Sequence, residues 1–139
     1  MEKQYQKKVF IVDDDADDRQ IIKEAFSECQ GENACVYFES AQKLLSAMHN
    51  KEHPLPLLVL LDLNMPGLTG LQALKEIRGN SKFSQVPVVV LTTSNLPRDK
   101  ASCYQLGASC FITKPDSFAK LVEIVNAISL LWLTGNEIP

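Results

Sequence analysis

The sequence lacks several features that mark common functional classes. Its four cysteines form no C-x-x-C pair and only two histidines accompany them, so we expect neither a zinc site nor a disulfide framework. A net charge of −3 gives no basic excess, which argues against direct binding of nucleic acid. There is no P-loop and no G-x-G-x-x-G motif, so the chain is not expected to bind ATP itself.

Long hydrophobic stretches are also missing. No apolar run approaches the roughly 20 residues that a membrane span requires, and the first eight residues are polar and lack a signal-peptide core. We therefore expect a cytoplasmic protein without membrane contact. The 139 residues, 45% of them hydrophobic, suit one domain over 1–139, with its core at about 8–133 and a short flexible tail at 134–139.

The segment 57–70, LLVLLDLNMPGLTG, is the most informative part of the chain. An unbroken apolar run leads into Asp62, and Pro66-Gly67 then forces a turn. Such a run is typical of a strand buried on both faces of a parallel sheet. Ligands of open α/β sheets bind at the carboxyl ends of the strands, so Asp62 is a candidate site residue. On this stretch alone, a capping role in a loop explains Asp62 equally well.

Strand-like runs and helical patterns alternate along the whole chain. Further β-prone runs lie at 9–12, 34–38, 86–91 and 109–113. Apolar residues at helical spacing follow the strands at 21–29, 41–48, 71–77 and 118–133, and Pro97 suits the first turn of a short helix at 97–106. Five β–α repeats with short connections predict an α/β fold, a doubly wound parallel sheet with helices on both faces.

Polar residues with complementary chemistry stand at the ends of these strands. They are Asp13 and Asp14 after the first, Asp62 after the third, Thr92 after the fourth and Lys114 after the fifth. Three neighbouring carboxylates favour a bound divalent cation, for which Mg²⁺ is suited, or a protonated member. A cation, a lysine and a hydroxyl around one carboxylate would bind the oxygens of a phosphoryl group, with the carboxylate as nucleophile.

Together these motifs resemble the response regulator receiver domain, the CheY-like family. The resemblance rests on V-D-D after the first strand, L-D-L-N-M-P-G after the third, L-T-T-S after the fourth and K-P after the fifth, and it covers about 8–133. It implies a five-stranded flavodoxin-like (βα)5 fold with strand order 2-1-3-4-5. It also implies a single-domain response regulator of a two-component phosphorelay, which is a phosphoacceptor signalling protein rather than a metabolic enzyme.

The resemblance assigns roles to the acidic residues. Asp62 matches the phosphoacceptor, and Asp13 and Asp14 match the acidic pair that holds Mg²⁺. Asn64 matches the position whose backbone carbonyl completes the metal site. The remaining aspartates at 15, 17 and 18 are interpreted as helix caps, helix-dipole partners or solvated surface rather than ligands.

The resemblance also assigns the switch. Thr92 matches the hydroxyl that moves toward the phosphoryl group, and Lys114 matches the lysine that pairs with it. The Lys114–Pro115 bond is implied to be cis. The aromatic switch position is Phe111 here, where the family often has tyrosine, so the coupling between Thr92 and Phe111 is less secure than the phosphorylation chemistry.

The expected partner is a sensor histidine kinase. The runs at 14–18 and 92–94 resemble stand-alone regulators paired with bacterial phytochrome-type kinases, and no DNA-binding output domain is expected. The last helix carries more apolar residues than one packed face requires, and its end reads Leu130-Leu131-Trp132-Leu133. We therefore expect a homodimer or partner surface there, centred on Trp132 and Leu133.

Two other functions are compatible with parts of this pattern. A phosphatase of the haloacid dehalogenase type also uses an aspartate nucleophile, but it needs a second aspartate two residues later, where Asn64 stands. A scaffold that has lost phosphorylation would not need the complete set Asp14, Asp62, Thr92 and Lys114. Both alternatives fit the sequence less well than a phosphorylated switch.

Overall fold

The computed structural model describes residues 5–29, 35–52, 54–65 and 67–133, so the tail expected at 134–139 lies outside the described residues. The elements are β1 (Tyr5–Val12), α1 (Ala16–Cys29), β2 (Cys35–Phe38), α2 (Ala41–His49), β3 (Leu55–Leu61), α3 (Gly70–Gly79), β4 (Val88–Thr92), α4 (Pro97–Gln105), β5 (Cys110–Thr113), α5 (Phe118–Ile128) and the short π-helix η2 (Ser129–Leu133).

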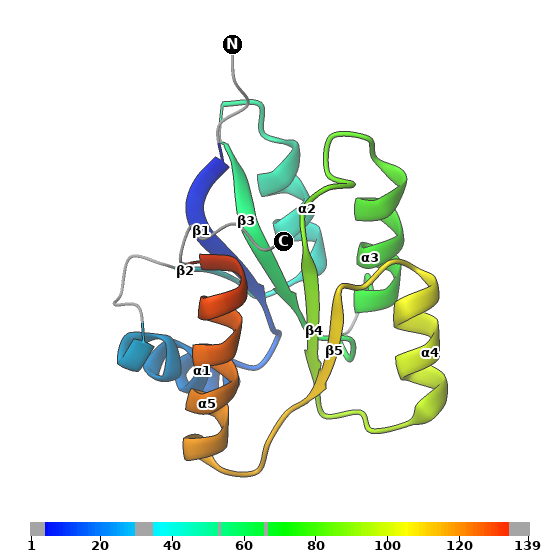
Figure 1. Cartoon of the computed structure of the whole chain (residues 1–139). Coiled ribbons are helices and arrows are strands. Elements are labelled where there is room, and N and C mark those ends of the chain that lie inside the picture. Colours follow the sequence, from blue (N-terminus) through cyan, green and yellow to red (C-terminus); the bar gives the residue numbers. More distant parts are fainter. Residues whose placement is uncertain (1–4, 30–34, 53, 66, 134–139) are drawn as a thin grey trace.

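The strands form one sheet of five parallel strands in the order β2-β1-β3-β4-β5. The predicted fold and strand order are confirmed. Strand β3 lies in the centre and is buried along most of its length, as its unbroken apolar run predicts. Because all five strands run the same way, their carboxyl ends meet along one edge, at the bottom of the sheet in Figure 1.

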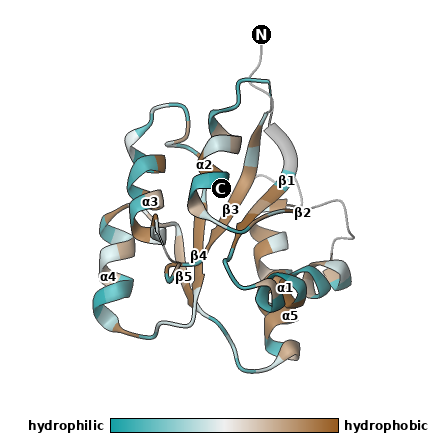
Figure 2. Ribbon diagram, turned by 180° about the vertical axis from the view of Figure 1, so that it is seen from behind, coloured by the Kyte–Doolittle hydropathy of each residue, from teal (hydrophilic) through white to brown (hydrophobic). Residues whose placement is uncertain are grey.

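Helices cover both faces of the sheet. Helices α1 and α5 pack on one face, and α2, α3 and α4 lie on the other (Figure 1). Hydrophobic residues concentrate on the central strands β3 and β4 (Figure 2). Within this arrangement α4 is held least firmly, because Cys103 is its one buried residue.

Side-chain caps fix where several helices begin. The Asp15 carboxylate accepts backbone N–H groups from the first turn of α1 at 2.8 and 3.1 Å, and Ser40 and Ser117 cap α2 and α5. Thr69 and Gln72 form a reciprocal capping box at the start of α3. These caps set how the helices leave the sheet edge that carries the candidate site.

The observed elements differ from the predicted ones mainly at their ends. Strand β1 begins at Tyr5 rather than at 9, and β3 begins at Leu55, because Tyr5 and Gln6 pair with Leu55 and Pro56 ahead of a register shift. The residues paired there do not form an unbroken apolar run, so the sequence did not mark them as part of the strands. The last helix changes to a π-helical turn at Ser129. Among the described residues, no helix has both the length and the hydrophobicity needed to cross a bilayer.

Candidate functional site

Three carboxylates meet at the carboxyl edge of the sheet. Asp13, Asp14 and Asp62, which we call the acidic cluster, each offer an oxygen within 4.8 Å of the others. The backbone positions two of them: the Asp13 N–H donates to the carbonyl of Phe38 at 3.1 Å, and the Asp62 N–H donates to that of Val12 at 3.1 Å. Asp13 and Asp62 are buried, with 1% and 6% exposure, whereas Asp14 is exposed.

Lys114, the residue after the end of β5, lies against the acidic cluster. Its Nζ donates to Asp13 Oδ2 at 2.7 Å and lies 3.6 Å from Asp62 Oδ2. Burial by itself would lower the pKa of Lys114, but hydrogen bonds to Asp13 and Asp18 and the charges of Asp13 and Asp62 outweigh it, so this pKa is raised. The ammonium is therefore charged throughout the physiological range.

The Asp13 carboxyl responds differently to the same surroundings. Its burial raises its pKa, and the negative charge of Asp62 adds to that effect, while Lys114 and the backbone of Asp15 oppose it. Lys114 does not offset the loss of water around this buried carboxyl, to which Asp62 adds a smaller repulsion. A divalent cation would stabilise the ionised form of Asp13 here.

A hydroxyl and an amide lie beside Asp62. Thr92 is fully buried, and its Oγ1 accepts from Asn64 Nδ2 at 3.4 Å and from the Ser94 N–H at 3.4 Å. The Asn64 N–H donates to Asp62 Oδ1 at 3.3 Å. A chain of contacts thus leads from Asp62 through Asn64 to Thr92 and on to the β4–α4 loop.

The contacts of Ser94 extend that chain. Ser94 Oγ donates to the Asp99 carboxylate on α4, and its carbonyl accepts from Thr113 Oγ1 at 3.0 Å. Phe111 is half-buried and packs against the core formed by α2, α3 and α4. Its backbone N–H donates to the Tyr104 hydroxyl at 3.1 Å, so α4 is tied to β5 as well as to the loop.

The start of α3 lies directly against the backbone of Asp62 and Leu63. A Cβ atom on Gly70 would lie 2.3 Å from the backbone oxygen of Asp62 and 2.6 Å from the Cα of Leu63. The Gly70 N–H donates to the carbonyl of Leu63 at 3.2 Å. Helix α3 therefore touches the backbone that carries Asp62, and the absence of a side chain at Gly70 permits this approach.

Two expectations from the sequence need correction. The Lys114–Pro115 bond is trans, since no peptide bond between described residues is cis; the Lys114 N–H, which donates to the carbonyl of Thr92 at 2.6 Å, holds the end of β5 beside β4 without a cis bond. Asp18 is not simply solvated surface or a dipole partner, because its carboxylate accepts from Lys114 Nζ at 2.9 Å.

The end of the last helix also differs in detail from the expectation. Trp132 and Leu133 are half-buried and pack against the core formed by α1 and α5. Leu130 and Leu131 are the more exposed side chains, at 61% and 48%. An interface at this end of the chain stays a prediction, with its exposed apolar area on Leu130 and Leu131.

Comparison with known proteins decides the family. The profile described as the response regulator receiver domain matches residues 9–126. The chain belongs to the response regulator receiver family. As a receiver, it is a two-component signalling protein. Among the positions that its motifs singled out, Asp13, Asp14, Asp62 and Lys114 lie together at the sheet edge.

Some relatives of this receiver are similar to it over nearly their whole length. Rcp1 of Synechocystis sp. is 28% identical over 137 residues, which cover 96% of this chain and 93% of Rcp1. The structure of Mn(2+)-bound Rcp1 gives a TM-score of 0.84, with 96% and 99% of the two chains covered. The phosphorylated cyanobacterial phytochrome response regulator RcpA gives 31% identity and a TM-score of 0.84 over 96% and 99%.

A third neighbour is the bacteriophytochrome response regulator RtBRR. It is 27% identical to this receiver, with a TM-score of 0.75 and coverage of 96% of this chain and 84% of its own.

The acidic cluster supplies hard oxygen ligands only, which suit a divalent cation such as Mg²⁺ or Mn²⁺. The receiver's donor set therefore fits a divalent metal.

Proposed function

We propose that this receiver accepts a phosphoryl group on Asp62 from a sensor histidine kinase, in a reaction that requires Mg²⁺. The observation that supports this most directly is the meeting of Asp62 with Asp13, Asp14 and Lys114 at one sheet edge. Asp62 is buried, at 6% exposure. These residues suffice for accepting a phosphoryl group, so we propose no metabolic reaction.

The chemistry is a transfer between two proteins. A carboxylate oxygen of Asp62 attacks phosphorus, the P–N bond of a phosphohistidine breaks, and the imidazole leaves with the bonding electron pair. Lys114 is placed to offset the charge on the phosphoryl oxygens. A divalent cation held by Asp13, Asp14, Asp62 and the backbone carbonyl of Asn64 would supply further positive charge there. Attack of water on the acyl phosphate then restores Asp62.

Phosphorylation is proposed to act through the contacts of Thr92. The added charge would draw the Thr92 hydroxyl toward the phosphoryl group, away from its weak 3.4 Å contacts with Asn64 and Ser94. Movement of Ser94 would displace its hydrogen-bond partners, Asp99 on α4 and Thr113 on β5. This shifts the population of a second surface, in which Phe111 takes part.

The partners are proposed from the relatives. RcpA is a phytochrome response regulator and RtBRR a bacteriophytochrome response regulator, which supports a kinase of the phytochrome type. The apolar end of the chain, with Leu130 and Leu131 exposed beside half-buried Trp132 and Leu133, supports a homodimer or a partner surface there. The Trp132→Ala variant should change the mass in solution or the affinity for the kinase.

The test is the intact mass of the protein after incubation with acetyl phosphate, with and without Mg²⁺. We expect one added phosphoryl group on the wild type that needs Mg²⁺, and none on Asp62→Asn. Phosphate release is measured in parallel, because fast hydrolysis would hide the adduct. No adduct and no release from a folded protein would contradict the proposal and leave a non-phosphorylated scaffold.

A further inference from the structure

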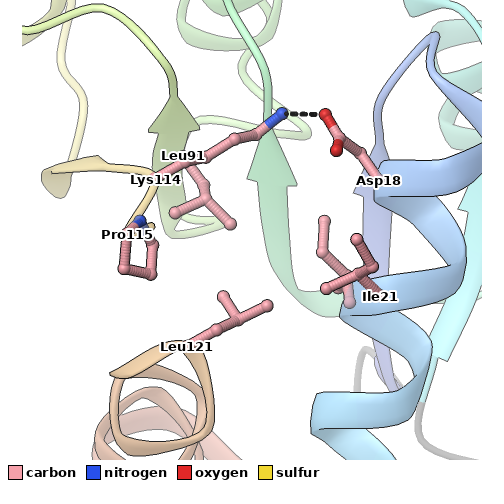
Figure 3. A pocket seen from close by; sticks show the side chains of 7 residues that line it. Asp18, Ile21, Leu91, Lys114, Pro115 and Leu121 are labelled. Atoms are coloured by element: carbon pink, nitrogen blue, oxygen red, sulfur yellow. Dashed lines mark hydrogen bonds and ion pairs between the residues drawn. The ribbon is translucent and has the colours of Figure 1, made fainter. Parts of the chain in front are cut away.

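Asp18 contacts the reactive lysine from outside the acidic cluster. It is the third residue of α1, and its carboxylate faces Lys114 Nζ across the upper rim of a small pocket (Figure 3). The pocket, of about 90 Å³, is otherwise lined by apolar side chains of α1, α5 and the sheet, among them Ile21, Leu91 and Leu121. A side chain at this place in a helix points back toward its N-terminus, which brings Asp18 to the strand ends.

The partners of Lys114 divide into two groups. Asp13 at 2.7 Å and Asp62 at 3.6 Å belong to the acidic cluster, whereas Asp18 at 2.9 Å does not. A cation in the cluster would draw on Asp13 and Asp62 and would repel the lysine ammonium. Asp18 would then be the carboxylate that still offers Lys114 a full ion pair.

The pocket shows what Lys114 would meet without that partner. The Lys114 side chain is only 14% exposed, and a swing down from the rim would take its ammonium toward Ile21, Leu91 and Leu121. A charge moved among apolar side chains loses both water and its ion pairs, which is costly. Asp18 and the apolar side chains of the pocket together keep the ammonium close to Asp62.

We propose that Asp18 is a positioning residue for phosphoryl transfer, which holds Lys114 beside Asp62 while the cation site is occupied. The inference rests on the proposed phosphorylation of Asp62. An ammonium has three N–H groups, and those directed at Asp13 and Asp18 leave one for a phosphoryl oxygen. Asp18 therefore acts through Lys114 and does not itself touch the reacting atoms.

The test compares Asp18→Asn with Asp17→Asn. Both variants remove one negative charge from the first turn of α1, but Asp17 is exposed and is not a partner of Lys114. With saturating Mg²⁺, we expect Asp18→Asn to lower the limiting rate of phosphorylation by acetyl phosphate about tenfold, as misplaced catalytic groups do. Its half-saturating concentration of acetyl phosphate should stay within about twofold of the wild-type value, and Asp17→Asn should match the wild type.

A second readout does not depend on phosphorylation. The rate at which an amine-acylating reagent modifies Lys114 is followed by peptide mass spectrometry, with the exposed Lys120 as internal reference. We expect Asp18→Asn to raise the labelling of Lys114 several-fold over wild type, and more so with Mg²⁺ than without it. In a Lys114→Gln background, Asp18→Asn should have no further effect on the phosphorylation rate, because coupled residues are not additive.

Several results would overturn the inference. These are an unchanged or faster limiting rate in Asp18→Asn, an equal loss in Asp17→Asn, an equal further loss in the Lys114→Gln background, or unchanged labelling of Lys114. If the wild type itself is neither phosphorylated nor releases phosphate, the proposed function fails. The labelling experiment still decides in that case whether Asp18 holds Lys114 against the cation.

Discussion

Replacing Gly70 by alanine should move Asp62, the proposed phosphoacceptor. A methyl group at Gly70 would meet the backbone oxygen of Asp62 at 2.3 Å and the Cα of Leu63 at 2.6 Å, about 1 Å closer than carbon and its neighbours pack. Both contacts are backbone atoms, so they cannot rotate away as a flexible side chain would. Overpacking of this kind costs about 1–3 kcal/mol of stability, and a shift of about 1 Å at Asp62 should slow phosphoryl transfer about 100-fold.

Urea unfolding and the rate of phosphorylation by acetyl phosphate measure the two effects. Gly79→Ala is the matched control in the same helix, because a Cβ there meets nothing within 4 Å. That variant should gain about 0.4–1 kcal/mol, because alanine restricts the unfolded chain more than glycine does, and it should keep the wild-type rate. Wild-type stability in Gly70→Ala would refute the overpacking argument. A normal rate despite lost stability would show that the close approach of α3 does not position Asp62.

Three further predictions concern single contacts. The pKa of Lys114 is raised above its ordinary 10.5, so the contribution of the ammonium to folding stability is fully present below pH 10.5 and is lost as the pH rises through the folded-state pKa. The difference in unfolding free energy between wild type and Lys114→Gln should be about 2 kcal/mol at neutral pH. In urea titrations this difference should shrink at alkaline pH. Arg78 donates to two backbone carbonyls outside its own helix at 2.8 Å each, so Arg78→Ala should lose about 2 kcal/mol in urea unfolding, and a loss below about 0.5 kcal/mol would contradict this assignment. Tyr104→Phe removes the acceptor of the Phe111 N–H, which should cost about 1 kcal/mol and speed hydrogen exchange at that amide; unchanged exchange would show that water replaces the hydroxyl.

The strand ends could be predicted because burial leaves a simple sequence signal. An apolar run that stops at a polar residue marks both the strand and the sheet edge, and Asp13, Asp62 and Thr92 follow their runs directly. Their convergence then depends only on the strands being parallel. The identity of the site thus followed from topology, while its distances did not.

The contact between Asp18 and Lys114 was not predicted, because an acidic residue in the first turn of a helix already has an ordinary explanation. In the first turn of α1 Asp18 looks like the acidic residues that favour any helix N-terminus, and only the angle at which α1 leaves β1 brings its carboxylate to Lys114. The direction of helical side chains toward the N-terminus was the available signal. Similarly, the run at 130–133 shows excess apolar residues, but not that Trp132 packs inward while Leu130 stays exposed, because that depends on the π-helical turn.

The weak anchoring of α4 has a consequence for how this protein can diverge. Cys103 is its one buried residue, while Asp99 and Tyr104 hold the loop and β5. The remaining exposed positions of the helix include Arg98 and Lys100. Substitutions there should each change stability by no more than about 0.5 kcal/mol. Substitutions can therefore change the charge and shape of this face, in evolution or in design, without changing the chemistry at the sheet edge.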